Sequence, residues 1–154
     1  MGDSEIKGQW ALILGASSGF GAACARKLAE RGLNIFGVHL DRRATLPNVE
    51  KIAEDIRVQE REAEFFNINA ASPEKREETL DRIQARFSET PGTVKVLVHS
   101  LAFGTLKPYV ASKVEDSIAQ AQMEMTLDVM ANSLVYWVQD LVYRGLMVEG
   151  GRVY

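Results

Sequence analysis

The segment that most constrains the fold of this chain is a glycine-rich turn, Gly15-Ala16-Ser17-Ser18-Gly19-Phe20-Gly21. It follows an apolar run from Trp10 to Leu14 and leads directly into a helical pattern. A helix that starts this way presents unpaired backbone N–H groups at the positive end of its dipole. The sequence therefore predicts a site for an anion such as a pyrophosphate, formed by Gly15, Ser17, Ser18, Gly19, Phe20 and Gly21. An ordinary tight turn is the alternative interpretation.

Composition excludes several classes of protein. The chain has 154 residues, 46% apolar and 25% charged, which is typical of one globular domain. Its net charge of −3 without a basic stripe argues against a nucleic-acid partner. No apolar run approaches the ~20 residues of a membrane span. His39, His99 and Cys24 lack the spacing of metal ligands, so no metal site is expected.

The start of the chain and its cysteine content indicate a compartment. Residues Met1 to Glu5 are polar and acidic, unlike a secretory signal peptide. The single cysteine cannot form an internal disulfide. We therefore expect a cytoplasmic protein.

Apolar runs and helical patterns alternate along the chain. Strands are predicted at residues 10–14, 34–40, 64–69 and 94–100. Helices are predicted after the glycine turn, after Pro47, from Pro73 with Ser72 as its N-cap, and within 114–146. This alternation predicts an α/β fold, a Rossmann-type doubly wound parallel sheet.

The last residues predict a turn at Gly150-Gly151 followed by the start of a fifth strand at Arg152 to Tyr154. In the strand order 3-2-1-4-5-6, the strand at 94–100 would then be a poorly covered edge. We therefore expect residues 1–154 to be a single dinucleotide-binding domain that is incomplete and ends at the start of strand five. A partner subunit that supplies the missing strand is the alternative.

The long C-terminal helix carries more apolar surface than one sheet face needs. Trp137 and Met123 are expected to lie away from its main stripe. We expect core packing to account for most of the stripe and a homo-oligomer interface for the rest. The stripe consists of Leu127, Met130, Ala131, Leu134, Val135, Val138, Leu141 and Val142.

The G-x-x-x-G-x-G spacing of Gly15, Gly19 and Gly21 resembles the N-terminal part of a short-chain dehydrogenase/reductase, and the resemblance covers nearly the whole chain. Asn67 and Ile68 match the place where that family contacts the adenine. His99-Ser100-Leu101-Ala102-Phe103-Gly104 is similar to the segment after strand four in enoyl-acyl-carrier-protein reductases, although the glycine turn has the general family's form. The resemblance implies cofactor contacts at Ser100, Leu101 and Ala102.

Asp41, Arg42 and Arg43 follow the second predicted strand and bear on the choice of dinucleotide. A carboxylate there would bind a ribose 2′-hydroxyl, whereas guanidinium groups would bind a 2′-phosphate. By count from Gly21, the family's acidic position falls on His39, which favours NADP(H), with NAD(H) possible. A solvated turn whose charges contact nothing is the alternative.

The resemblance implies an oxidoreductase that transfers hydride to a carbonyl or an acyl-thioester enoyl substrate. Its Ser and Tyr-x-x-x-Lys are expected beyond Tyr154, and we interpret the match of Tyr109 and Lys113 to this spacing as chance. Asn132 matches the family's helix asparagine, which holds a water in the proton relay. His99 ends a strand, where it either faces the ligand crevice or is held by local bonds. The alternatives in function are a non-catalytic dinucleotide-binding or sensor protein and a catalytically incomplete fragment.

Overall fold

The computed structural model describes residues 9–154, and within them a parallel sheet has the strand order β3-β2-β1-β4-β5. The interpretation of Met1 to Glu5 falls outside the described residues. The predicted α/β, Rossmann-type fold is confirmed, and β5 pairs with β4 through Arg152 opposite Val96. The strands are β1 (Trp10–Leu14), β2 (Asn34–His39), β3 (Ala63–Asn67), β4 (Val94–His99) and β5 (Arg152–Val153).

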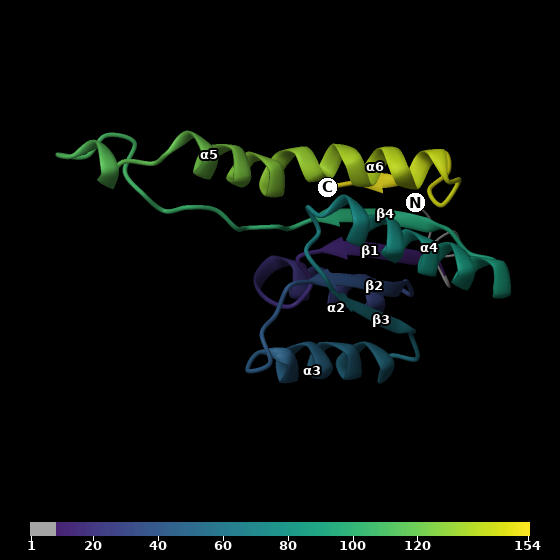
Figure 1. Ribbon diagram of the computed structural model, residues 1–154. Coiled ribbons are helices and arrows are strands. Elements are labelled where there is room, and N and C mark those ends of the chain that lie inside the picture. The colour runs from purple at the N-terminus through teal and green to yellow at the C-terminus, as the bar shows by residue number, and fades with distance from the viewer. Residues whose placement is uncertain (1–8) are drawn as a thin grey trace.

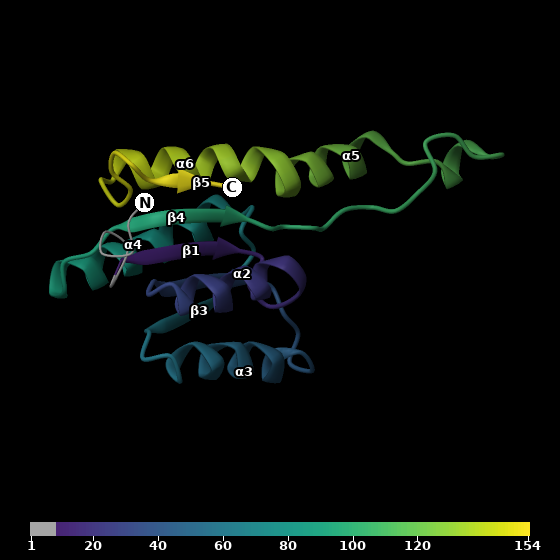
Figure 2. The ribbon, with the colours of Figure 1, turned by 180° about the vertical axis from the view of Figure 1, so that it is seen from behind.

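Helices cover both faces of this sheet. Figures 1 and 2 show α2 and α3 on one face and α4 and α6 on the other. No helix within residues 9–154 combines the length and the apolar character needed to cross a membrane. The helical elements are α2 (Gly19–Glu30), α3 (Leu46–Arg57), α4 (Pro73–Glu89), the 3₁₀ helix η1 (Val114–Asp116), α5 (Gln120–Leu127), the π-helix η2 (Asp128–Asn132) and α6 (Ser133–Tyr143).

The central strand β1 is buried along its whole length because both of its faces are covered. Trp10, Leu12 and Leu14 pack on the side of α4 and α6, and the Trp10 ring stacks on Phe36 with centroids 3.9 Å apart. Ala11 and Ile13 pack on the opposite side, against the small residues of α2. Those small residues, Ala22, Ala25 and Ala29, let α2 lie close to the sheet.

Element boundaries differ from the predictions by one or two residues in most cases. Strand β2 ends at His39 rather than residue 40, and α3 begins at Leu46, one residue before Pro47. The predicted cap of α4 is present, because the Ser72 hydroxyl accepts a hydrogen bond from the Lys75 amide at 3.4 Å. These shifts leave the order and type of the elements unchanged.

The C-terminal helical stretch departs from the prediction in continuity and in orientation. It is α-helical from Gln120, passes through the π turn η2, and continues as α6. Trp137, expected away from the main stripe, is fully buried and donates its Nε1–H to the Ala70 carbonyl at 2.9 Å. The sheet accepts only one narrow face of this helix, and the large indole occupies it. Five residues of the predicted stripe are therefore exposed instead: Leu127, Met130, Ala131, Val135 and Val142.

Residues 105–119, called here the arm, extend away from the sheet between β4 and α5 (Figure 1). Four large apolar side chains of the arm are exposed, at Leu106, Tyr109, Val110 and Val114. Tyr109 is 80% exposed, and its side chain lines no wall of the pocket described below. The start of the arm is tied to α5, because the Thr126 hydroxyl accepts a hydrogen bond from the Thr105 amide at 3.3 Å.

Candidate functional site

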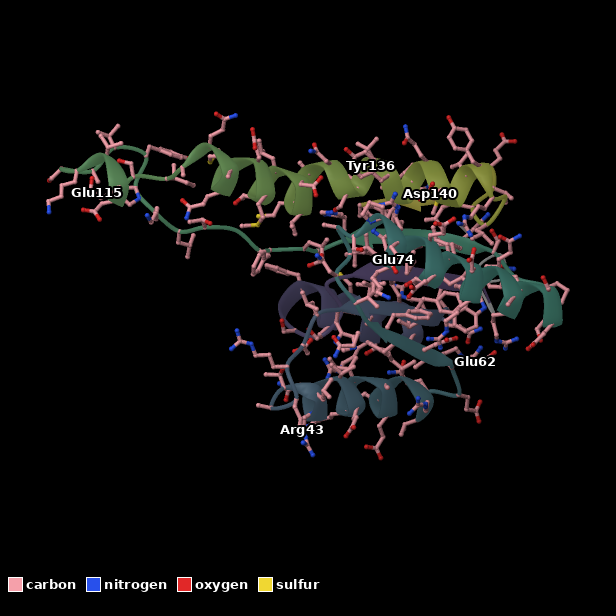
Figure 3. The ribbon with its side chains drawn as sticks, viewed as in Figure 1. Arg43, Glu62, Glu74, Glu115, Tyr136 and Asp140 are labelled. Carbon is pink, nitrogen blue, oxygen red and sulfur yellow. The ribbon has the colours of Figure 1, made fainter. Side chains whose placement is uncertain are left out.

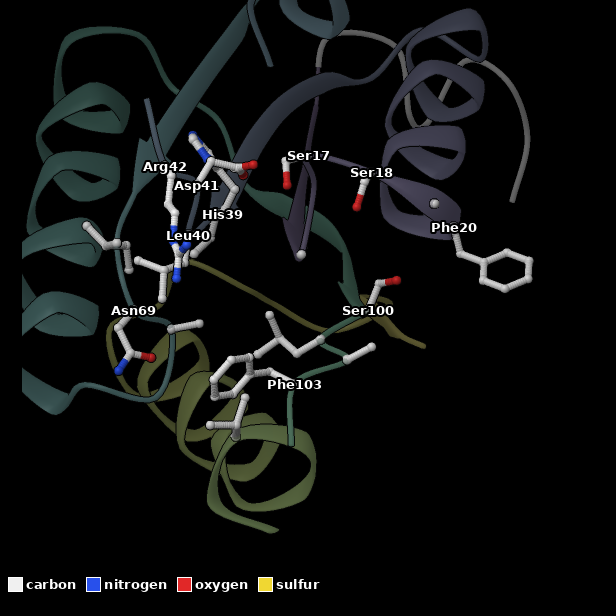
Figure 4. A pocket seen from close by; sticks show the side chains of 18 of the residues that line it. Ser17, Ser18, Phe20, His39, Leu40, Asp41, Arg42, Asn69, Ser100 and Phe103 are labelled. Carbon is white, nitrogen blue, oxygen red and sulfur yellow. The ribbon is translucent and has the colours of Figure 1, made fainter. Parts of the chain in front are cut away.

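A pocket of about 820 Å³ lies where the loops leave the carboxyl ends of β1, β2, β3 and β4 (Figure 4). The chain proceeds from β1 toward β3 on one side and to β4 on the other, so this is the switch point at which open α/β sheets bind ligands. Its walls are formed by Gly15, Ser17, Ser18, Gly19, Phe20, Val38, His39, Leu40, Asp41, Arg42, Ile68, Asn69, Ala70, Ser100, Leu101, Ala102, Phe103, Met125 and Val129.

Two glycines let the backbone close tightly beneath this pocket. Gly15 has φ of +88°, and a Cβ there would overlap the Ser100 carbonyl. A Cβ on Gly21 would overlap the Gly15 carbonyl oxygen. Gly21, predicted to contact a ligand, packs inside the turn and does not line the pocket. Side chains at either position would force the turn away from β4.

The start of α2 faces the pocket with unpaired amides. Ser18 is the N-cap residue, but its side chain makes no capping bond, and the first turn of α2 contains no acidic residue. The first amides of a helix have no intrahelical acceptor, so they leave a positive end here. Figure 4 shows the Ser17 and Ser18 hydroxyls at the pocket and the Phe20 ring turned away from it. Phe20 is 87% exposed, so what it can offer a ligand is its backbone amide.

Asp41 is a fixed carboxylate on the opposite rim. Burial alone would raise the pKa of Asp41, but hydrogen bonds from Ser17, Thr45 and His39 outweigh it and hold that pKa below its usual range. The His39 Nδ1 lies 3.0 Å from Asp41 Oδ2, and His39 itself is buried. Figure 4 shows the Asp41 carboxylate turned toward Ser17. This carboxylate thus ties the glycine turn to the loop after β2.

Asn67 holds the backbone of the same loop. Its side-chain oxygen accepts from the Asp41 amide at 2.9 Å, and its side-chain amide donates to the Asp41 carbonyl at 3.0 Å. Asn67 was expected beside a ligand, yet it does not line the pocket, because its polar atoms are used in this pair of bonds. The next residue, Ile68, does line it.

The two arginines after Asp41 point in different directions. Arg42 lines the pocket, and Figure 4 shows its guanidinium extending over it. Arg43 is exposed at the start of the α3 region and points away from the sheet in Figure 3. Arg43 therefore does not line this pocket, because consecutive loop residues present their side chains to different sides, and its contact with a 2′-phosphate stays a prediction.

The wall opposite Arg42 comes from the end of β4 and from the C-terminal helical stretch. Ser100, Leu101 and Ala102, which are predicted to contact the cofactor, line it. Sequence reasoning missed the contributions of α5 and η2, because those elements are distant along the chain. The missed lining residues are Val38, His39, Leu40, Asn69, Ala70, Phe103, Met125 and Val129, and of these Asn69 and Ala70 could have been found as residues that follow a parallel strand.

Asn132 and His99 do not line the pocket. Asn132 is exposed at the end of the π turn and does not line the cavity. His99 Nε2 lies 2.9 Å from the Ser133 hydroxyl, and burial lowers the pKa of His99. Within residues 9–154 no cluster of three or more His, Cys, Asp or Glu side chains is arranged to hold a metal ion.

Known proteins share this sequence pattern and fold. A family model described as Enoyl-(Acyl carrier protein) reductase matches residues 15–154. A 2,3-dihydro-2,3-dihydroxybenzoate dehydrogenase of Bacillus subtilis is 29% identical over 116 residues, which are 75% of this chain and 41% of that protein.

Two solved structures resemble the fold. The promiscuous reductase LugOII, which catalyses keto-reduction at C1 in lugdunomycin biosynthesis, has a TM-score of 0.77 and 22% identity over 97% of this chain and 59% of its own. The L-sorbose reductase of Gluconobacter frateurii, solved with NADPH and L-sorbose, has a TM-score of 0.69 and 20% identity over 90% of this chain and 48% of its own. The chain thus spans about half the length of these relatives.

Proposed function

Since this chain belongs to the short-chain dehydrogenase/reductase superfamily, we propose that it binds NADP(H) and forms the cofactor-binding part of an enzyme that reduces a carbonyl or an enoyl thioester. One observation carries the proposal: the unpaired amides at the start of α2 open into a pocket of about 820 Å³. Glycine at positions 15 and 21 lets the turn pack closely beneath the pocket, where a Cβ would overlap the backbone of Ser100 or of Gly15. A dinucleotide diphosphate has the charge and shape for this turn.

The adenosine end of the ligand falls between the loops after β2 and β3. Leu40 and Ile68 offer apolar surface there for the adenine. Arg42 supplies the cation that binds a ribose 2′-phosphate, because its guanidinium reaches the pocket. The Asp41 carboxylate is already engaged by the His39 imidazole, 3.0 Å away, and by the Ser17 hydroxyl, so it is occupied before a phosphate approaches. This arrangement favours NADP(H) over NAD(H).

The nicotinamide supplies the hydride when the cofactor is bound. The residues of this chain position and shield the site: Ser100, Leu101 and Ala102 form the wall at the end of β4, and Met125 and Val129 close it from the helical side. Asn132 is our candidate for holding a water near the reacting groups. The acyl-thioester class of substrate is supported by the family model and by the His99 to Ala102 segment.

Isothermal titration of the intact protein with NADPH and NADH tests the proposal, with Arg42→Ala as the variant and Arg43→Ala as its matched control. We expect Arg42→Ala to raise the Kd for NADPH by about tenfold or more, as expected for a lost charge-assisted hydrogen bond. The Kd for NADH should change less than about twofold, and Arg43→Ala should behave as the wild type for both.

Two results would contradict this assignment. An equal loss of affinity for NADPH and NADH in Arg42→Ala would show that Arg42 does not contact the 2′-phosphate. Absence of binding of either dinucleotide to the folded wild-type protein would overturn the proposal as a whole.

A further inference from the structure

A hydrogen-bonded chain joins the end of β4 to the C-terminal helical stretch. The Ser133 hydroxyl donates to the Val129 carbonyl at 2.8 Å, and His99 Nε2 lies 2.9 Å from the same hydroxyl. A hydroxyl has one proton to donate, and here it goes to Val129. With its proton on Val129 the hydroxyl can accept, and the Nε2–H tautomer of His99 donates to it. Ser133 is fully buried, so this contact is shielded from competing water.

The chain of bonds ends at the π turn η2. In an α-helix the Ser133 amide would bond to the Val129 carbonyl, four residues earlier. Here that amide bonds instead to the carbonyl of Asp128, five residues earlier. The Ser133 hydroxyl takes up the Val129 carbonyl that its own amide has left. The Ser133 side chain thus replaces the backbone hydrogen bond that the Val129 carbonyl loses in the π turn. His99 holds the Ser133 hydroxyl in place.

Ser133 also marks the point at which the helical stretch first meets the body of the protein. Neither α5 nor η2 contains a buried residue, whereas α6 is anchored by the buried Trp137 and Leu141. An ion pair between Arg76 Nε and Asp140 Oδ2, 2.7 Å apart, adds a second anchor for α6. Figure 1 shows α5 extending beyond the sheet from this point. The direction of α5 is therefore set where Ser133 meets His99.

We propose that His99 and Ser133 are positioning residues, which hold the π turn so that Met125 and Val129 close the pocket and Asn132, the last residue of that turn, is held in place. The inference deepens the proposed function and rests on it for the roles of the pocket and of Asn132. A hydrogen bond between a strand that ends at the pocket and a helix that walls it fixes their relative position. Neither side chain needs to contact the substrate.

Three variants test whether His99 and Ser133 position the π turn through their hydrogen bond or only fill space in the core. Ser133→Ala removes only the hydroxyl, and His99→Leu removes the donor. His99→Gln is the matched control, because its side-chain amide nitrogen can donate from nearly the position of Nε2. Hydrogen–deuterium exchange of the intact protein reads the π turn directly, with the amides around Trp137 and Leu141 as an internal reference.

We expect Ser133→Ala and His99→Leu to speed exchange at residues 128–133 by about tenfold, the effect of losing one hydrogen bond. Exchange in the second half of α6 should stay unchanged, and His99→Gln should restore the slow exchange at 128–133. Unchanged exchange at 128–133 in both removing variants would overturn the proposal. Equal acceleration in His99→Gln and His99→Leu would overturn the role of the Nε2 donor.

A kinetic measurement adds the functional half of the test. NADPH oxidation is followed with crotonoyl-CoA as the enoyl probe and acetoacetyl-CoA as the carbonyl probe. We expect Ser133→Ala to lower kcat by about tenfold while the Kd for NADPH stays within about twofold, since the glycine turn is untouched. A kcat equal to that of the wild type would overturn the proposal.

Failure of the proposed function is distinguishable, because wild-type protein would then neither bind NADPH nor turn over either probe. The exchange experiment would still decide whether His99 and Ser133 hold the π turn.

Discussion

The buried imidazole of His99 makes the stability of the protein depend on pH. Burial lowers the pKa of this imidazole below its usual value of about 6.5, so the unfolded chain binds the proton more readily than the folded one. Its contribution to stability is complete above the unfolded pKa and is lost as the pH falls through the lower folded pKa.

We therefore expect the free energy of unfolding in urea to fall more steeply in the wild type than in His99→Gln between about pH 7 and about pH 5. The glutamine keeps a donor but does not ionise in this range. Parallel decreases in the two proteins would show that His99 does not carry this pH dependence.

Sequence reasoning found the phosphate-facing turn because the chemistry of Gly15, Ser17 and Ser18 depends on local backbone geometry. It could not separate Arg42 from Arg43, since the side on which a loop residue presents its side chain depends on φ and ψ at each position. It also could not decide whether Asp41 binds a ribose hydroxyl or is a solvated charge at the surface. The contacts that fix this carboxylate come from His39 and Ser17, which only the folded sheet brings together.

Among the elements, the C-terminal helical stretch shows where periodicity fails. Its apolar residues occupy two faces, so a count of spacings cannot say which face the sheet buries. The buried positions are Ser133, Trp137 and Leu141, and the serine gave no apolar signal. The strands were predictable because a parallel sheet covered on both faces requires continuous apolar runs.

Trp137 should contribute to stability through its hydrogen bond as well as its volume. In Trp137→Phe the Ala70 carbonyl loses the indole donor, and the smaller ring leaves a small void. We expect a decrease of about 2 kcal/mol in the free energy of unfolding, measured by circular dichroism in urea.

Val135→Ala is the control for Trp137→Phe, because Val135 is 52% exposed on the same helix. It should change stability by less than about 0.5 kcal/mol. Comparable losses in the two variants would argue that the sheet-facing side of α6 has been assigned incorrectly.

At the scale of the whole molecule, α5, η2 and α6 present an exposed apolar face that the sheet does not cover, formed by Leu127, Met130, Val135 and Val142. Exposed patches of this kind are typical of interfaces between protein chains. We expect the protein to self-associate through this face. Sedimentation velocity should show that a Val135→Lys and Val142→Lys double variant shifts the population toward monomers.

Val58→Lys provides the control for association, since Val58 is 79% exposed at the end of α3, away from this face. It should sediment as the wild type does. A monomeric wild type, or equal shifts in both variants, would exclude the α5, η2 and α6 face as the site of association.

The π turn has one more consequence, for the tolerance of the chain to length changes. A π turn behaves as an α-helix with a single additional residue, so removing one residue from 128–132 would let the stretch rewind as a continuous α-helix. Each residue of an α-helix accounts for about 100° of rotation. The wider π turn absorbs the rotation of its additional residue, so such a deletion would leave α5 in nearly the same orientation and Met125 at the pocket, while the sheet and its hydrophobic layers stayed as they are.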